Sequence, residues 1–297
     1  MEKVLVIVGQ TAVGKTSMSI RLAKHLNGEI INGDAMQVYK GLNIVTDKIK
    51  KEQMQGVPHH LFDLKEIHED YNVEEYQSNI RKVIKQISNK GKLPIIVGGT
   101  GLYVKASLYD YNFSKEEISN KEVEELYKDK TNDELYEMLY SLDPKSCETI
   151  HKNNRRRVLR ALAIYNATGK TKSEMIDDQK HELLYNAIII ALDLDKQIIN
   201  DKIDKRIEEM FDEGLIEEVK NNPTTSTASK AIGYKEVSSY LNNEISLEEA
   251  KQLMKIHTHQ YAKRQRTWFK HQLPVNFVNN DENAFDNIIN IIDEKWK

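Results

Sequence analysis

A pattern able to bind phosphate groups lies close to the N-terminus. Residues 9–16 read GQTAVGKT, which satisfies G-x-x-x-x-G-K-[ST], and they stand between a β-type apolar run at residues 4–8 and a helix-type pattern. In such a loop the backbone amides turn toward phosphate oxygens, the lysine adds a positive charge, and the Ser/Thr hydroxyl can bind Mg²⁺. We therefore predict a bound diphosphate or triphosphate, with Thr16 as a ligand of Mg²⁺. The residues expected to surround it are Gly9, Gln10, Thr11, Ala12, Val13, Gly14, Lys15, Thr16 and Ser17.

Two more candidate reactive side chains follow later strand-like runs. Asp34 comes after the run at residues 29–32, and Thr100 stands in the glycine turn GGTG after the run at residues 93–97. Since the carboxyl ends of parallel strands meet at one edge of a sheet, both should lie near the phosphate loop. There a carboxylate can take a proton from a nucleophile, and a hydroxyl can contact a substrate. The structural alternatives are a turn or helix-capping role for Asp34 and a capping role for Thr100.

The phosphate loop alone does not tell whether a phosphate is transferred, hydrolysed or expelled as a leaving group. Nucleotide hydrolases and kinases usually carry an aspartate at the end of a later strand, where it supports Mg²⁺. Here the strand-like run at residues 93–97 is followed by the glycine turn instead. This disfavours an ordinary nucleotide hydrolase and favours a different chemistry at a related site.

The elements that must position these residues follow an α/β pattern. Apolar β-type runs alternate with helical patterns in the first third of the chain, which predicts a P-loop core with a parallel sheet flanked by helices. From about residue 113 the patterns are helical and charged, until a β-type run returns at residues 186–192. We therefore predict a core of residues 1–112 and 187–297, interrupted by an all-helical insertion domain of residues 113–186. Helices are expected at residues 74–88, 116–128, 131–142, 154–168, 196–211 and 247–269, and a mobile polar loop at residues 221–229.

Composition narrows the class of protein. With 297 residues, 39% of them hydrophobic, the chain has no apolar run of membrane-spanning length and no signal-peptide pattern, so we expect a cytoplasmic protein that does not contact a membrane. Its one cysteine, Cys147, excludes an internal disulfide and a zinc finger. The adjacent His59 and His60 lack a third metal ligand, so they are expected to be structural or to line a channel. Because the net charge is -3, any contact with a polyanion must come from basic clusters, at residues 155–160 and 263–270.

Six segments together resemble one known family. The segment NGDAMQVYKGL at residues 32–42 is similar to the D-S-x-Q-x-Y-x-G-[LM] signature of tRNA dimethylallyltransferases, also called isopentenylpyrophosphate transferases. Further blocks of that family resemble, in the same order, GVPHHL (56–61), VGGTGLY (97–103), residues 153–162, IGY (232–234) and YAKRQ (261–265). The resemblance extends from Gly9 to Trp268. Departures are small: Ala35 stands where many members have serine, and Asn154 where an aspartate is common.

The resemblance implies a bacterial-type enzyme with a specific reaction. Such an enzyme moves the dimethylallyl group from dimethylallyl pyrophosphate to the N6 amine of an adenosine adjacent to the anticodon in tRNA and releases pyrophosphate, with Mg²⁺ as cofactor. Asp34 would act as the base and Thr100 would contact the substrate. Lys15, Thr16 with Mg²⁺, and Arg206 would stabilise the leaving pyrophosphate. For Arg206, a surface arginine paired with Glu209 or Glu213 at helical spacing is an equally weighted alternative.

The resemblance also implies which residues bind tRNA. They are Asp34, Ala35, Met36, Gln37, Thr100, Arg156, Arg157, Arg160, Lys230, Gly233, Tyr234 and Lys235, with Arg264, Arg266 and Trp268 as weaker candidates. From the residues alone, the arginine block is a solvated helix face. Recognition is expected to rest on charge and shape, with the target base flipped from its stack. We expect a monomer.

Three other functions stay open from the sequence. A small-molecule or nucleotide kinase of the P-loop class shares the fold, the phosphate loop and Mg²⁺. A non-catalytic tRNA-binding module leaves the phosphate loop beside Asp34 and Thr100 unexplained. A relative that prenylates free adenine nucleotides has no need of the helical insertion with its arginine block.

Overall fold

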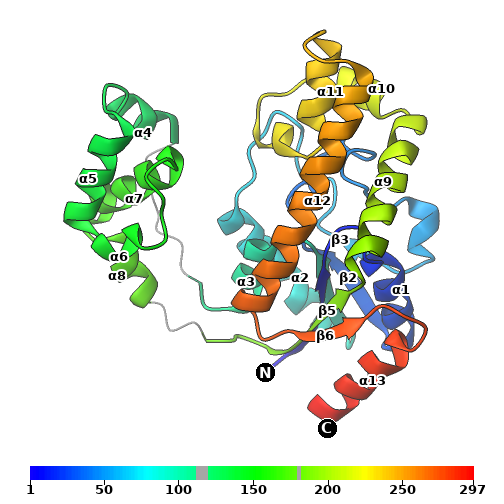
Figure 1. The fold of residues 1–297 in the computed structure, drawn as a ribbon. Coiled ribbons are helices and arrows are strands. Elements are labelled where there is room, and N and C mark those ends of the chain that lie inside the picture. Colours follow the sequence, from blue (N-terminus) through cyan, green and yellow to red (C-terminus); the bar gives the residue numbers. More distant parts are fainter. Residues whose placement is uncertain (112–119, 179–181) are drawn as a thin grey trace. The chain divides into compact units, whose positions relative to one another are not determined.

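A parallel β-sheet forms the centre of the larger of two compact units. The computed structural model describes residues 1–111, 120–178 and 182–297. Within these residues the sheet has six strands in the order β3-β2-β4-β1-β5-β6, and all neighbouring strands run parallel (Figure 1). The strands are β1 (Lys3–Gly9), β2 (Gly28–Asn32), β3 (His59–His60), β4 (Leu93–Gly98), β5 (Asn186–Asp193) and β6 (Asn276–Asn279). The predicted P-loop core with a parallel sheet is therefore confirmed.

Helices surround the sheet and make up the smaller unit. In the larger unit they are α1 (Lys15–His25), α2 (Val73–Asn89), α3 (Gly101–Leu108), α9 (Lys196–Asp212), α10 (Leu215–Asn221), α11 (Tyr234–Leu241), α12 (Leu247–Gln272) and α13 (Ala284–Lys295), with the 3-10 turns η1 (Lys51–Met54) and η2 (Thr227–Lys230). In the smaller unit they are α4 (Asn120–Leu126), α5 (Asn132–Leu142), α6 (Pro144–Cys147), α7 (Arg155–Thr168) and α8 (Lys172–Asp177). No helix in the described part of the chain combines the length and apolarity needed to cross a bilayer.

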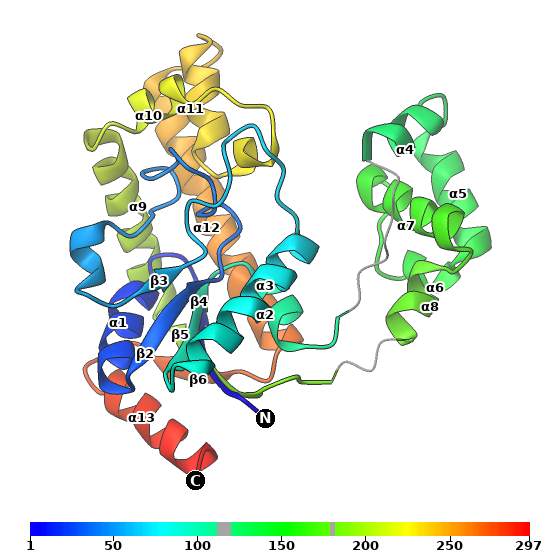
Figure 2. The same ribbon diagram turned by 180° about the vertical axis from the view of Figure 1, so that it is seen from behind.

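The central strands are apolar because both faces of the sheet are covered. Every residue of β1 after Lys3 is buried, and all five residues of β2 are buried. Figures 1 and 2 show α1 on one side of the sheet and α2 with α3 on the other. Strands buried on both faces are typical of parallel sheets, whose ligands bind at the carboxyl ends of the strands. The neighbours β2, β4 and β1 therefore bring the turns that follow them to one edge.

Two long helices, α9 and α12, pack against each other beside this edge. On α9 the buried side chains recur every three or four residues, at Ile199, Ile203, Ile207 and Met210. This spacing forms one apolar stripe, which fixes the rotation of the helix about its axis. As a result, residues on adjoining faces of α9 and α12, such as Arg206, are held toward the cavity at the sheet edge.

The smaller unit has a hydrophobic core of its own. The chain divides into one unit of residues Met1–Tyr109 and Leu183–Lys297 and a second of Asp110–Glu182. Buried side chains of the second unit, among them Leu135, Leu139 and Leu162, form a separate cluster. Helix α5 begins with a capping box between Thr131 and Glu134. The second unit thus has the core and helix caps of an independently packed helical unit.

Several elements differ from the sequence-based expectations. The edge strands β3 and β6 were not predicted, because runs of two and four residues carry too little periodic signal. The first residues of the helix expected at 116–128 lie outside the described residues; α4 begins at Asn120. The polar stretch 221–229, expected to be a mobile loop, contains the start of η2 and is hydrogen-bonded to the core: Thr224 Oγ1 donates to Ile67 O at 2.7 Å, and Ser226 caps η2.

Candidate active site

The phosphate loop joins β1 to α1, and the side chain of its lysine hydrogen-bonds back to the loop backbone. Gly14 adopts a φ of 97° at the N-cap of α1, a conformation that favours glycine. Lys15 Nζ donates to Gly9 O at 3.1 Å and to Gln10 O at 2.7 Å. The ammonium group is thus held inside the loop, at the positive end of α1, where an anion is favoured.

The turn after β2 is held rigidly around Asp34. The buried side chain of Asn32 donates to Asp34 O at 3.0 Å and accepts from Asp34 N at 2.9 Å. Asp34 Oδ1 accepts from Met36 N at 2.8 Å, so this carboxylate does make the turn contact expected as its structural alternative. Its Oδ2 faces the Gly99 side of the cavity. Backbone hydrogen bonds from Met36 and Gln37 therefore hold the carboxylate, and Oδ2 faces the cavity.

The turn after β4 lies against the turn after β2. A Cβ atom on Gly98 would lie closer than 3.0 Å to backbone atoms of Gly33, so the two backbones meet where only glycine fits. Thr100 occupies the N-cap position of α3, but its hydroxyl does not cap the helix; instead Oγ1 accepts from Ala35 N at 3.0 Å. Thr100 is thereby tied to the turn that carries Asp34.

Burial shifts the ionisation of both central groups. It lowers the pKa of Lys15 from 10.5 to about 8, and the negative charge of Asp34 opposes that shift. Burial raises the pKa of Asp34, against the hydrogen bond from Met36 N and the positive charge of Lys15. The cavity therefore places a lysine and a carboxylate that influence each other and that titrate nearer to neutral pH than in water. Such shifts are common at functional sites.

Arg206 reaches from α9 to the phosphate loop. Its Nη2 donates to Thr11 Oγ1 at 2.7 Å, and its Nη1 pairs with Asp47 Oδ2 at 2.7 Å. The alternative pairing with Glu209 or Glu213 is not formed, because those carboxylates pair with Lys205 and Lys50. A guanidinium is thus held at the phosphate loop, where it can interact with a bound anion.

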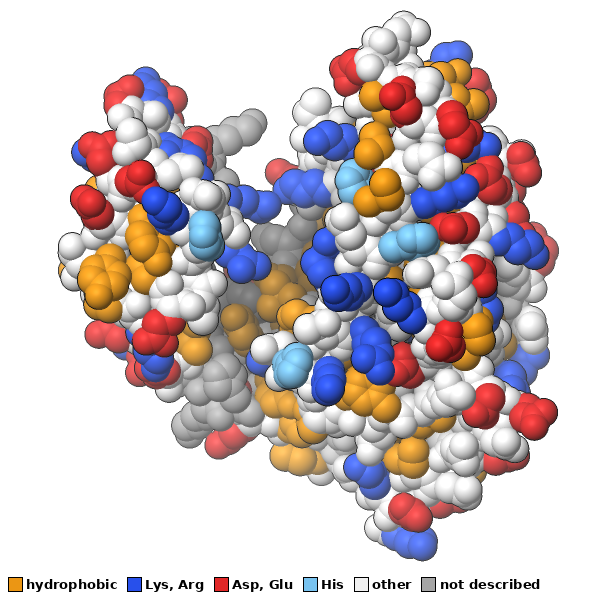
Figure 3. Space-filling view, viewed as in Figure 1, with side chains coloured by type: hydrophobic (Ala, Val, Ile, Leu, Met, Phe, Trp, Pro, Cys, Tyr) orange, Lys and Arg blue, Asp and Glu red, His pale blue; other side chains and the backbone are white. Residues whose placement is uncertain are grey.

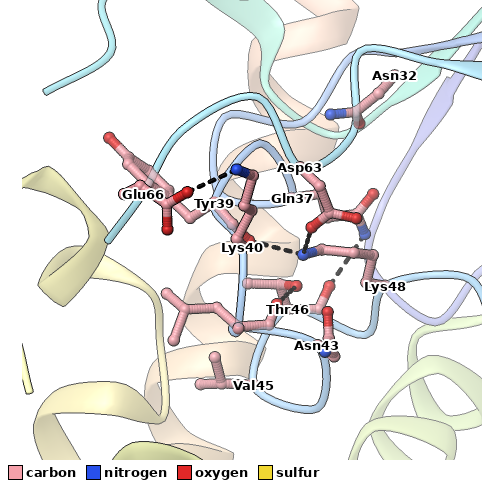
Figure 4. Close-up of polar contacts among 12 residues, drawn as sticks. Asn32, Gln37, Tyr39, Lys40, Asn43, Val45, Thr46, Lys48, Asp63 and Glu66 are labelled. Atoms are coloured by element: carbon pink, nitrogen blue, oxygen red, sulfur yellow. Dashed lines mark hydrogen bonds and ion pairs between the residues drawn. The ribbon is translucent and has the colours of Figure 1, made fainter. Parts of the chain in front are cut away.

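A folded loop between β2 and η1 forms one wall of the site (Figure 4). Gln37 Nε2 donates to Thr46 O at 3.0 Å and to Asp47 O at 3.3 Å. The buried Lys48 bridges Tyr39 O and Asp63 Oδ1, each at 2.6 Å. These bonds fix the loop from both ends and leave Gln37 Oε1 as the amide atom still able to accept a hydrogen bond from a ligand.

A carboxylate from α10 holds the middle of this loop. Glu218 accepts from the backbone N–H groups of Asn43, Ile44 and Val45 at 2.8 to 3.0 Å. Three consecutive donors on one carboxylate set the path of the chain up to Asp47. Neither Glu218 nor Asp47 was predicted as a site residue, since nothing in the sequence spacing links them to the phosphate loop.

One cavity of about 730 Å³ contains most of the predicted residues. The predicted residues that line it are Thr11, Ala12, Gly14, Lys15, Thr16, Asp34, Ala35, Met36, Gln37, Thr100, Arg206, Lys230 and Arg264. The lining also includes Asp47, Tyr261 and Gln265, which were not predicted as site residues. Asp34 and Lys15, predicted from separate segments, thus face the same space. The remaining residues of the phosphate loop, Gly9, Gln10, Val13 and Ser17, support it without lining the cavity.

The tRNA-binding candidates near Gly233 divide into two groups. Tyr234 is 5% exposed, and its hydroxyl donates to Asn222 O and accepts from Thr224 N, so it is a packing residue here. Gly233 is also buried, whereas Lys235 is exposed and Lys230 lines the cavity.

The two adjacent histidines make hydrogen bonds at the sheet. The ring of His59 hydrogen-bonds to Val57 O, and the ring of His60 hydrogen-bonds to Glu29 Oε2.

The arginine block lies on α7 of the smaller unit. Arg156, Arg157 and Arg160 are exposed, while Arg155 is bound to Glu124 and to backbone carbonyls. On the larger unit, Figure 3 shows Lys and Arg side chains gathered over the face that carries α12. The exposed basic residues of that helix are Lys263, Arg264, Arg266 and Lys270. Each unit thus has a basic surface suited to phosphate groups.

The fold and this cavity define a class of protein. A parallel sheet with a G-x-x-x-x-G-K-T loop at its carboxyl edge is a P-loop fold, and the cavity adds a carboxylate, a hydroxyl and an arginine around that loop. The class is a P-loop enzyme that moves a group away from a phosphate-containing donor.

Comparisons with known proteins identify the family within this class. The family model described as IPP transferase matches residues 37–272. The tRNA dimethylallyltransferase of Anoxybacillus flavithermus is 50% identical over 98% of this chain and 95% of its own length, and that of Bacillus licheniformis is 46% identical over 92% and 89%. The chain belongs to the IPP transferase family, so the resemblance found in the sequence is confirmed.

Solved structures agree with this assignment. The tRNA isopentenylpyrophosphate transferase of Bacillus halodurans superposes with a TM-score of 0.76 at 39% identity, over 99% of this chain and 97% of that one. A eukaryotic dimethylallyltransferase described as acting on tRNA superposes with a TM-score of 0.85 at 31% identity, over 99% of this chain and 79% of that one. The P-loop transferase fold is thus shared along the whole chain.

Proposed function

We propose that this enzyme transfers the dimethylallyl group from dimethylallyl pyrophosphate to the N6 amine of an adenosine adjacent to the anticodon in tRNA. The observation that carries the proposal is that Lys15 of the phosphate loop and the carboxylate of Asp34 line one cavity. The names of the relatives, tRNA dimethylallyltransferase, supply the group and the acceptor. Since one chain provides both sides of the cavity, a monomer suffices for the reaction.

On the acceptor side, Asp34 takes the proton. The exocyclic amine of adenine is a weak nucleophile, because its lone pair is delocalised into the ring. Asp34 Oδ2 accepts one N6 proton while Oδ1 stays bound to Met36 N. The new bond forms between N6 and C1 of the prenyl group, and the C1–O bond breaks with its electron pair going to pyrophosphate. Thr100, tied to Ala35, orients the amine beside this carboxylate.

On the donor side, positively charged side chains stabilise the leaving pyrophosphate. Lys15 and Arg206 meet at the phosphate loop and stabilise the negative charge that grows on pyrophosphate as the C1–O bond breaks. The residues fit Mg²⁺, because the exposed hydroxyl of Thr16 lines the cavity and a Mg²⁺ ion needs few protein ligands when phosphate oxygens and waters complete its shell. When bound there, Mg²⁺ neutralises part of the pyrophosphate charge.

Binding of tRNA is assigned to the basic surfaces of both units. Arg156, Arg157 and Arg160 on α7 contact phosphates, as do Lys230 and Lys235 on the larger unit. Gln37 Oε1 is available to accept a hydrogen bond from a base next to the target. Residues 110–182 thus act as a tRNA-contacting insertion, and residues 1–109 and 183–297 as the catalytic core.

The test is the mass of nucleosides from tRNA incubated with enzyme, Mg²⁺ and dimethylallyl pyrophosphate. We expect an adenosine carrying one dimethylallyl group, located beside the anticodon by digestion into oligonucleotides. A parallel incubation replaces dimethylallyl pyrophosphate with ATP and offers nucleosides as acceptors. Consumption of ATP with no prenyl adduct in the first arm refutes the proposal in favour of a kinase. Adducts on free adenine nucleotides but not on tRNA refute the choice of acceptor.

A further inference from the structure

A buried glutamine bridges the two halves of the cavity. Gln265 of α12 is 5% exposed. Its Oε1 accepts from Thr11 N of the phosphate loop at 2.8 Å, and its Nε2 donates to Gly99 O in the turn after β4 at 3.0 Å. Both ends of one side-chain amide are therefore bound to backbone groups that lie 88 residues apart, at positions 11 and 99 of the chain.

Each end of this bridge is linked to residues assigned to one of the two substrates. At the phosphate loop, Thr11 Oγ1 accepts from Arg206, which faces the leaving group. At the other end, Gly99 precedes Thr100, whose hydroxyl accepts from Ala35 N beside Asp34. A continuous path of hydrogen bonds and peptide links thus runs from the arginine, through Gln265, to the turn that carries the base.

The close approach of helix and turn depends on the residue types. A Cβ atom on Gly99 would lie closer than 3.0 Å to Gln265 Nε2, so a larger residue at this position would displace the amide. The bridge also needs an acceptor for Thr11 N and a donor for Gly99 O at the same time. A glutamine amide supplies both, and an ionised glutamate supplies only acceptors.

We propose that Gln265 is a positioning residue that fixes the separation between the phosphate loop and the Asp34–Thr100 side of the cavity. The inference rests on the proposed function, because that separation sets the distance from C1 of the donor to N6 of the acceptor. Displacement of one reacting group by about 1 Å costs about 10²-fold in rate. Binding of each substrate alone depends on one side of the cavity and does not require the bridge.

A merely structural role for a buried amide predicts a different pattern. The two backbone groups that the amide satisfies in a buried site stabilise the fold, so loss of these hydrogen bonds lowers stability. It then reduces activity only in proportion to the folded fraction. The positioning role instead lowers the transfer rate of fully folded enzyme while leaving each substrate bound.

The first experiment compares Gln265→Met with Gln252→Met. Gln252 lies on the same helix, is exposed and donates to Glu248, which makes it a matched control. Single-turnover prenyl transfer and the separate dissociation constants for tRNA and dimethylallyl pyrophosphate are measured at a temperature where each variant is folded. We expect about 10-fold to 100-fold slower transfer in Gln265→Met with both dissociation constants changed less than about 3-fold. An unchanged rate, or a loss confined to substrate affinity, overturns the proposal.

A second variant uses pH as the readout. In Gln265→Glu the protonated acid still donates to Gly99 O, whereas the ionised form repels that carbonyl. Its transfer rate, divided by the wild-type rate at the same pH, is expected to rise as pH falls from 8 to 6. The division removes the pH dependence that is common to both proteins. A ratio that stays flat across this range contradicts the bridging role.

A third measurement does not depend on prenyl chemistry. Hydrogen exchange of residues 98–101 is followed with and without inorganic pyrophosphate. The bridge predicts that pyrophosphate slows exchange in this turn in the wild type and has a smaller effect in Gln265→Met. Equal slowing in both proteins overturns the inference. A wild type that shows this coupling but prenylates no tRNA refutes the proposed function alone.

Discussion

Replacement of Arg206 by alanine should slow prenyl transfer without preventing substrate binding. Arg206 donates at 2.7 Å to Thr11 Oγ1 and at 2.7 Å to Asp47, and its side chain is only 21% exposed, so its charge is held at the phosphate loop. Removal of one preorganised donor from a developing anion costs about 10²–10³ in kcat. Because Asp47 offsets part of the charge, we expect the lower end, about 100-fold or about 2.7 kcal/mol.

The assay is single-turnover transfer with both substrates saturating. Arg21→Ala is the matched control, since Arg21 is an exposed arginine on α1 that stacks on Phe285 and its loss changes the net charge equally. Arg206→Lys should fall between the wild type and Arg206→Ala, because a lysine keeps the charge but cannot bridge two partners as a guanidinium does. A loss smaller than about 3-fold in folded Arg206→Ala would refute the assignment of Arg206 to the leaving group.

Three further predictions concern the phosphate loop, the sheet edge and the cavity wall. Burial lowers the pKa of Lys15 to about 8, so its side chain loses its charge as pH rises through 8. The value of kcat/KM for dimethylallyl pyrophosphate should therefore fall over this pH range, and this fall should be absent in Lys15→Arg if that variant stays active. Gly98→Ala puts a Cβ atom into the backbone of Gly33 and should lower the free energy of unfolding by about 3 kcal/mol in denaturant titrations. Glu218→Ala leaves three loop N–H groups without their carboxylate, so hydrogen exchange of residues 43–45 should accelerate and transfer should slow. Neither change is expected in Glu217→Ala, because Glu217 pairs with Lys220 at the surface.

The parts of the site that sequence analysis predicted are those set by local order along a strand. The phosphate loop, Asp34 and Thr100 each follow an apolar run, and parallel strands bring their carboxyl ends together whatever the remaining chain does. Helix starts were also accessible, because capping boxes such as Thr131 with Glu134 are local. These features depend on neighbours within a few residues, which a sequence shows directly.

The parts that sequence analysis missed depend on distant packing. Gln265 meets Thr11 across 254 residues, and Asp47 meets Arg206 across 159, so no spacing rule links them. For Tyr234 the resemblance predicts tRNA contact, and the structure adds that its ring is buried and its hydroxyl donates to Asn222 O. The packing of α9 and α12 beside the sheet edge decides which of the polar side chains on these two helices face the cavity.

The most direct test of the account is the rate of prenyl transfer in Asp34→Asn at saturating tRNA and dimethylallyl pyrophosphate. Asparagine keeps an oxygen for Met36 N, so the turn and the binding of both substrates should persist while the proton acceptor is lost. We predict a transfer rate about 10²–10⁴-fold below the wild type, with dissociation constants nearly unchanged. In the wild type the rate should fall as pH drops through the raised pKa of Asp34, because the base is then protonated. Transfer at the wild-type rate in Asp34→Asn would contradict the central claim that this carboxylate is the base that accepts a proton from the adenine amine.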